Sequence, residues 1–138
     1  MERIFRIHFV KLIIYITTSI FFNSTGFAQW TQIGPFGGSV NSFAVIGSDI
    51  FAATDNSGIF CSSNNGTSWI QIDSGLTNHF FSSLVTNGTE LFAGSYYGGG
   101  GVFRSTDNGV SWKQVNSGLT DTYVSALIIK GSNVFAGT

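Results

Sequence analysis

Short runs of apolar and β-branched residues, separated by glycine-containing turns, recur along residues 38–138 and indicate strands rather than helices. Asn87-Gly88 is a strong hairpin signal, because both residue types tolerate the positive φ that a tight two-residue turn requires. The unit around this pair is predicted to contain four short strands, at residues 81–86, 90–95, 101–105 and 112–116.

The preceding residues show the same succession of runs and turns. Four strands are expected there, at residues 40–46, 50–54, 58–62 and 69–73. A third unit, 125–137, holds only the first two strands of the pattern, and residues 30–33 have the composition of the last strand of an earlier unit.

Internal repetition accompanies these strands. The segment SSNNGTSW, which ends at Trp69, returns 43 positions later as STDNGVSW, which ends at Trp112. Four short strands in a repeat of this length are the signature of a propeller blade. The expected fold is all-β, a β-propeller fragment of about two and a half four-stranded antiparallel blades, with units at about 34–73, 75–116 and an incomplete 118–138.

The first strand of each unit is its most apolar. In Val124–Ile129 (VSALII), apolar residues occupy both alternating sets of positions. This pattern predicts a strand buried on both faces, as the innermost strand of a blade would be between its neighbours.

Residues 1–28 have the features of a secretory signal peptide. Basic residues precede the eleven-residue apolar stretch 12–22, and small residues at Gly26 and Ala28 define a cleavage site before Gln29. The alternative is an uncleaved membrane anchor, although the apolar stretch is shorter than the roughly 17–25 residues of a spanning helix. We therefore expect a protein that is secreted, extracellular or periplasmic, with no membrane contact after cleavage.

Removal of the leader changes the charge. Residues 29–138 contain three basic and six acidic residues, a formal net charge of −3. A surface without a basic stripe does not favour nucleic-acid binding. Cys61 is the lone cysteine, so no internal disulfide can form, and no metal site or cofactor is expected.

The repeated eight-residue segment reads as a turn that leads into a strand. An Asp or Asn side chain can accept backbone N–H bonds, glycine takes the left-handed conformation, and tryptophan buries a large ring. The segment resembles the Asp-box, or bacterial neuraminidase repeat, of sortilin-like and photosystem II assembly-factor-like propellers. The second copy matches this motif at every position, and the first has Asn for Asp: Ser105, Asp107, Gly109, Ser111, Trp112 and Ser62, Asn64, Gly66, Ser68, Trp69. The resemblance implies that the motif forms a structural turn and that its residues are not catalytic.

Binding candidates come from the loops at the other ends of the strands. Tyr96 and Tyr97 lie in a glycine-rich connection that is two residues longer than its counterpart in the preceding unit, and exposed tyrosine rings suit stacking on a sugar or a protein. Asp55, His79 and Asp121 fall in loops of the same end. The alternative for the tyrosines is that one packs inward and the other caps the rim. Asp55 and Asp121 could also form a carboxylate pair for glycoside hydrolysis.

Two functions follow from these features. The first is a secreted repeat module that binds a carbohydrate or protein ligand without chemistry of its own, since no catalytic set of residues is evident. The second is a glycoside hydrolase of sialidase or xyloglucanase type, of which the sialidase form is disfavoured because Arg104 is the lone arginine after residue 28. Closed propellers need about 4–8 blades. We therefore expect a fragment of a longer extracellular protein, with the remaining blades in missing C-terminal sequence.

Overall fold

The computed structural model describes residues 34–35 and 38–138, which form strands and no helix. The predicted signal peptide and the predicted strand at 30–33 lie outside the described residues. The first sheet has the order β1-β2-β3-β4, with antiparallel neighbours. Its strands are β1 (Val40–Ile46), β2 (Asp49–Thr54), β3 (Ile59–Ser62) and β4 (Ile70–Gln71).

The second sheet repeats this topology, and a two-stranded sheet follows it. The second sheet contains β5 (Phe81–Thr86), β6 (Leu91–Ser95), β7 (Gly101–Ser105) and β8 (Lys113–Gln114). The final hairpin pairs β9 (Ala126–Lys130) with β10 (Asn133–Gly137). The all-β, propeller-like fold predicted from the sequence is confirmed.

The turns follow the predicted chemistry. Gly47, Gly88 and Gly131, one in each hairpin between the first and second strands, have φ values of 59°, 96° and 61°. Only glycine adopts this left-handed backbone without a steric penalty from Cβ. The first strands of the two four-stranded sheets also carry an irregularity near their start, between Val40 and Ser42 and between Phe81 and Ser83, so the repeat of these two sheets extends to the register of the strands.

The fourth strand of each four-stranded sheet is shorter than predicted. β4 and β8 have two residues each, whereas five were expected in both. At β8 the reason is visible, because the Trp112 N–H donates to the Ser74 carbonyl of the preceding unit at 2.9 Å instead of joining its own sheet. The chain thus enters the fourth strand while still bound to its neighbour.

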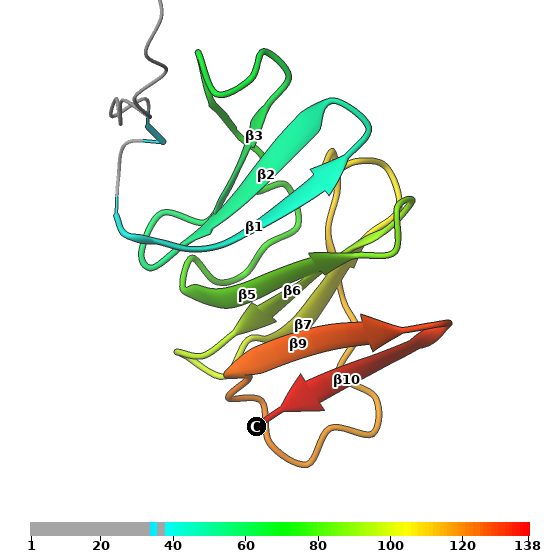
Figure 1. Cartoon of the computed structure of the whole chain (residues 1–138). Coiled ribbons are helices and arrows are strands. Elements are labelled where there is room, and N and C mark those ends of the chain that lie inside the picture. Colours follow the sequence, from blue (N-terminus) through cyan, green and yellow to red (C-terminus); the bar gives the residue numbers. More distant parts are fainter. Residues whose placement is uncertain (1–33, 36–37) are drawn as a thin grey trace, which may run out of the picture. The chain divides into compact units, whose positions relative to one another are not determined.

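The sheets stack in chain order, with β1 beside β5 and β5 beside β9 (Figure 1). Phe51, Phe81 and Phe103 are fully buried between the first two sheets, where the Phe81 and Phe103 rings meet edge to face at 5.8 Å. A second apolar cluster lies between the second sheet and the final hairpin, around Phe92 and Val124. Each interface therefore buries a face that one sheet alone would leave in water.

Polar side chains also connect the sheets. The Asn41 amide donates to the Phe81 carbonyl at 2.9 Å, and the Ser82 hydroxyl donates to the Val124 carbonyl at 2.6 Å. Asn41 and Ser82 occupy the same repeat position, 41 residues apart. The stacking geometry is thus the same at both interfaces, and these bonds satisfy carbonyls at the strand ends.

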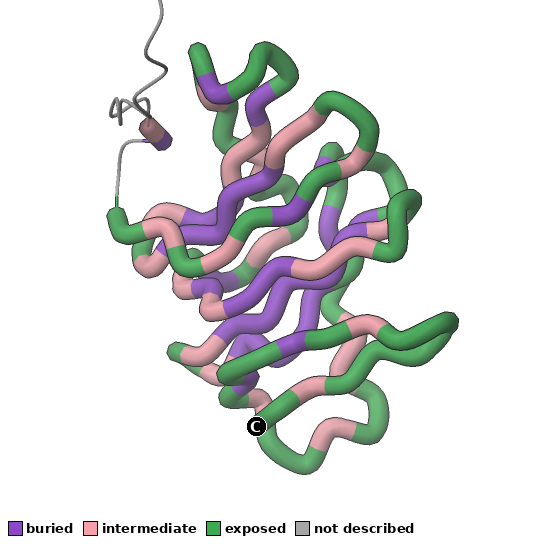
Figure 2. Tube along the Cα trace, viewed as in Figure 1, coloured by how far each residue is buried: buried purple, intermediate pink, exposed green. Residues whose placement is uncertain are grey.

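The prediction that first strands are buried on both faces is wrong for β1 and β9. Phe43 is 57% exposed and Ile128 is 64% exposed, whereas β6 is buried throughout and β2 is buried from Phe51 to Thr54 (Figure 2). The reason lies in the stacking, because β1 and β9 each have another sheet on one side only among the described residues. In β5, which lies between two sheets, Leu84 is 2% exposed.

Replacement of Trp112 tests the stacking. Its ring is 5% exposed between the first two sheets, and its Nε1–H donates to the Ile72 carbonyl at 2.9 Å. Trp112→Ala should lower the free energy of unfolding by about 3–5 kcal/mol, measured by urea denaturation, because a large buried ring is lost. Val110→Ala, in the same turn at a side chain 71% exposed, should change it by less than about 0.5 kcal/mol. Equal effects would contradict the packing described.

Candidate functional site

The antiparallel topology sorts the loops onto two ends of the sheets. The hairpins between first and second strands share one end with the turns between third and fourth strands, Ser62–Trp69 and Ser105–Trp112, which we call the tryptophan turns. The connections that contain Asp55, His79 and Tyr96 lie at the opposite end. We call this opposite end the tyrosine face.

Side chains at the centre of each tryptophan turn close it internally. The Ser105 hydroxyl donates to Asp107 Oδ1 at 2.7 Å and accepts the Gly109 N–H at 2.8 Å. The carboxylate of Asp107 also accepts the N–H and the hydroxyl of Ser111, at 2.9 and 2.6 Å. Asn108, which precedes the glycine, has a φ of 54°.

The first tryptophan turn is closed by the same residue pairs with an amide at its centre, although here the Asn64 Nδ2 donates to the Ser68 hydroxyl at 2.8 Å. The Gly66 N–H donates to the Ser62 hydroxyl at 2.8 Å, and the Ser68 N–H donates to Asn64 Oδ1 at 2.9 Å. The Trp69 ring lies 6.4 Å from the Phe43 ring. Within each turn, the polar side chains bond to one another and to the turn's own backbone, so we interpret both turns as structural elements.

Among the described acidic residues, Asp107 has the largest shift in pKa. Hydrogen bonds from the Ser111 hydroxyl and N–H and from Ser105 lower the pKa of its carboxyl from 3.8 to about 2. Bonds that favour the charged form depress a carboxyl pKa in this way. The perturbation therefore has a structural cause and does not mark a catalytic acid.

At the tyrosine face, loops of two sheets meet. The Tyr96 hydroxyl donates to Asp55 Oδ1, and these two residues occupy the same repeat position in adjacent units. The Phe80 ring lies 6.5 Å from the Tyr96 ring and 5.0 Å from the Tyr97 ring. Tyr96 is half-buried, and Tyr97 is 59% exposed. The structure thus brings three of the five predicted residues together, and the Phe80 ring contacts both tyrosine rings.

Asn78 holds the tyrosine connection in place. Its buried side chain donates to the Tyr97 carbonyl and accepts the Phe80 N–H at 2.9 Å. The connection itself bends through Gly98 and Gly99, with φ values of 72° and 69°. A buried amide with both ends bonded fixes the loop that carries the exposed Tyr97 ring.

His79 and Asp121 lie in neighbouring loops without a recorded bond to the tyrosines. The His79 carbonyl accepts the Gly58 N–H at 3.0 Å, while its side chain is exposed. Asp121 Oδ1 accepts the Tyr123 N–H at 2.9 Å, as Asn78 Oδ1 accepts the Phe80 N–H one unit earlier. Asp121 thus forms the same Asx turn as its repeat counterpart.

Sequence reasoning did not select Phe80 or Asn78 as site residues. In the sequence, Phe80 is half of the apolar pair Phe80-Phe81 that leads into a strand, and Asn78 follows Gly-Leu-Thr in a loop. The available signal was the repeat itself, since Asn78 and Asp121 stand 43 positions apart and both follow Gly-Leu-Thr. That signal identifies the turn, but the contact with Tyr97 depends on tertiary structure.

Arg104 does not contribute to the tyrosine face. Its guanidinium pairs with Glu90, beside the Asn87-Gly88 hairpin at the opposite end of the second sheet. Within residues 34–35 and 38–138, no group of three potential metal-ligating side chains occurs, and no helix is long and apolar enough to cross a membrane.

No family model matches this chain, and no curated protein matches its sequence. Its fold is similar to the extracellular domain of a putative hybrid two-component system from B. thetaiotaomicron, with a TM-score of 0.61 and 18% identity over 78% of this chain and 15% of that one. It is also similar to a GH74 xyloglucanase from Xanthomonas campestris, with a TM-score of 0.52 and 17% identity over 62% of this chain and 16% of that one.

The chain therefore spans about 15% of the length of these structures. At such identities the likeness shows the fold alone, an all-β arrangement of propeller type.

The pKa of Asp107 predicts how stability depends on pH. Because the folded pKa lies below the ordinary value, the stabilisation is present above about pH 4 and is lost as pH falls toward about 2. Urea denaturation of Asp107→Asn should therefore show a weaker loss of stability than the wild type over this range. Asn64→Asp is the matched variant in the first tryptophan turn and should steepen the loss. Superimposable acid profiles for all three proteins would contradict the prediction.

Proposed function

We propose that this chain is an extracellular binding module whose ligand contacts the tyrosine face. The observation that carries the proposal is the Tyr97 ring, which is 59% exposed on a connection held by the buried Asn78. An exposed aromatic ring on a fixed backbone offers contact area at a small cost in side-chain entropy. A carbohydrate or a protein ligand would stack on it.

Asp55 and Phe80 support the same assignment. Phe80 backs the Tyr97 ring at 5.0 Å, and Asp55 holds the hydroxyl of Tyr96, so the aromatic group is preorganised before a ligand arrives. Preorganisation reduces the entropy lost on binding. The exposed His79 side chain adds a polar group at this end of the sheets.

We further infer that the tryptophan turns are Asp-boxes, as in sortilin-like and neuraminidase-repeat propellers. The bonds between Ser105, Asp107 and Ser111 support this assignment. In the first turn, Asn64 Oδ1 likewise accepts bonds from the Ser62 hydroxyl and the Ser68 N–H. Secretion through the segment 1–28 is part of the proposal, and the extracellular domains among the similar folds favour it. The chain would then be one part of a longer propeller.

A glycoside hydrolase is the second candidate, favoured by the similar fold of a xyloglucanase. It would rely on Asp55 and Asp121, yet each carboxylate already accepts a hydrogen bond within the protein, from Tyr96 and from the Tyr123 N–H. Asp121 also has a turn-forming counterpart in Asn78, which has no acid–base chemistry. Binding without turnover therefore has the stronger support.

A panel of immobilised glycans and fluorogenic glycosides tests the proposal. The wild-type chain should bind at least one glycan, and Tyr97→Ala should weaken that binding by roughly tenfold or more, about 1.4 kcal/mol. Phe135→Ala removes another half-exposed ring, 52% exposed on the final hairpin, and should leave binding unchanged. Binding that is indifferent to Tyr97 would contradict the proposal. Turnover that disappears in Asp55→Asn or Asp121→Asn would favour the hydrolase.

A further inference from the structure

The formal charges of the described residues are divided unevenly between the two ends of the sheets. The basic side chains lie at the end of the tryptophan turns, together with an equal number of acidic ones. They are Arg104, Lys113 and Lys130, with Asp49, Glu90 and Asp107. The remaining acidic residues, Asp55, Asp73 and Asp121, lie in connections of the tyrosine face. The formal net charge of −3 therefore belongs to the tyrosine face, which attracts positively charged ligands.

Two of these carboxylates have oxygen atoms available to a ligand. Asp55 Oδ1 accepts the Tyr96 hydroxyl, whereas Asp55 Oδ2 accepts no hydrogen bond from the described residues. Asp73 is exposed, and its Cβ lies 4.0 Å from the point that a Cβ on Gly58 would occupy. The His79 Nδ1 lies 3.4 Å from the same point. Asp73 and His79 therefore border the loop that carries Asp55.

The backbone beside the Tyr97 ring carries no side chains, because four glycines follow Tyr97 directly. Gly98 and Gly99 have φ values of 72° and 69°, which glycine adopts without strain. Their N–H groups donate no hydrogen bond within the described part of the chain. A Cβ on Gly98 would lie 3.1 Å from Asn78 Nδ2, so the backbone packs closely on the buried amide below it. A ligand can thus approach two backbone donors while it contacts the ring.

These groups match the chemistry of a pyranose ring. The C–H face of such a ring can stack on Tyr97. Its hydroxyls can accept the N–H groups of Gly98 and Gly99 and can donate to Asp55 Oδ2. An amino group on the sugar, protonated at neutral pH, adds the positive charge that this face attracts.

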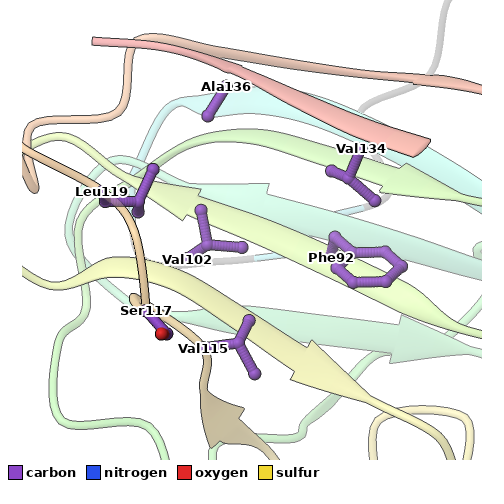
Figure 3. Close-up of a pocket in the computed structure, with 7 residues that line it drawn as sticks. All are labelled: Phe92, Val102, Val115, Ser117, Leu119, Val134 and Ala136. Atoms are coloured by element: carbon purple, nitrogen blue, oxygen red, sulfur yellow. The ribbon is translucent and has the colours of Figure 1, made fainter.

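The groove between the second sheet and the final hairpin has a different character (Figure 3). Its volume is about 320 Å³, and its lining is apolar apart from Ser117 and contains no charged side chain. A charged, hydroxylated ligand would lose its hydration there without gaining partners. The tyrosine face is therefore the better site for such a ligand.

We propose that the tyrosine face binds a glycan whose sugars carry free amino groups, an inference that rests on the binding function proposed above. One pyranose stacks on Tyr97 beside the glycine backbone. The protonated amines of this sugar and of its neighbours lie near the carboxylates of Asp55 and Asp73. N-acetylation removes the positive charge, so the face selects the free amine over the acetylated form. Acidic glycans are disfavoured by repulsion between like charges.

Two oligomers of equal length test the proposal, one of glucosamine and one of N-acetylglucosamine, because they differ in the charge on the amine. Isothermal titration calorimetry should give at least about tenfold higher affinity for the glucosamine oligomer. Raising NaCl from about 50 mM to about 500 mM should reduce this difference, because salt screens the attraction between charges. Equal affinity for the two oligomers, or tighter binding of the acetylated one, would overturn the proposal.

Variants of the protein locate the amine. Asp55→Asn removes a charge but keeps an oxygen for the Tyr96 hydroxyl, and Asp73→Asn introduces the amide that the repeat has at Asn116. Each should lower the affinity for the glucosamine oligomer at least about threefold and leave that for the N-acetylglucosamine oligomer unchanged. Asp49→Asn removes the same charge at the opposite end of the sheets and should change neither affinity. Equal effects of Asp55→Asn and Asp49→Asn would overturn the assignment of the site.

The outcomes separate this inference from the proposed function. Glycan binding that depends on Tyr97 but shows no preference for the free amine would overturn the inference and leave the proposed function standing. Absence of any Tyr97-dependent glycan binding would contradict both. An oligolysine peptide that binds as tightly as the glucosamine oligomer would show that the face recognises positive charge without the sugar, and would also overturn the inference. A preference for the free amine that disappears in Tyr97→Ala supports it.

Discussion

Burial of a tryptophan-bearing turn against the preceding sheet is the interaction on which the rest of this structure depends. Trp112 donates both its indole and its backbone N–H to carbonyls of the first unit, and Gly75 is small enough to let its backbone approach. A sheet of four short strands cannot bury two apolar faces alone. The turn therefore does more than reverse the chain, because it completes the core of its neighbour.

The same stacking creates the candidate binding face. It brings Asp55 and Tyr96, which occupy equivalent positions in adjacent units, within hydrogen-bonding reach of each other. A binding face with loops of two sheets is thus a consequence of repetition with a fixed offset.

At the candidate site, comparison of the repeats separates residues that recur for structural reasons from residues that occur in one unit alone. Asn78 and Asp121 form the same Asx turn, so the carboxylate of Asp121 has a role that an amide fills equally well one unit earlier. Tyr97 lies in a connection that is two residues longer than in the preceding unit, and its counterpart at the same offset, Asn56, has no aromatic ring. A residue that departs from the repeat is the better candidate for function, which favours the tyrosine connection over the acids.

The sequence by itself determined the strands, the hairpin glycines and the all-β class. The reason is that turn formation depends on residues adjacent in the chain, and the 43-residue repeat is visible in the sequence. The sequence also pointed to Tyr96 and Tyr97 through the lengthened connection. Only the tertiary structure decided which face of each strand is covered, as the exposure of Phe43 and Ile128 shows. The contacts of Phe80 and Asn78 with Tyr97 were likewise decided by the tertiary structure. The physical reason is that burial of a strand depends on whether a neighbouring sheet covers it. Equivalent strands of a repeat have the same apolar pattern whether they are covered or not.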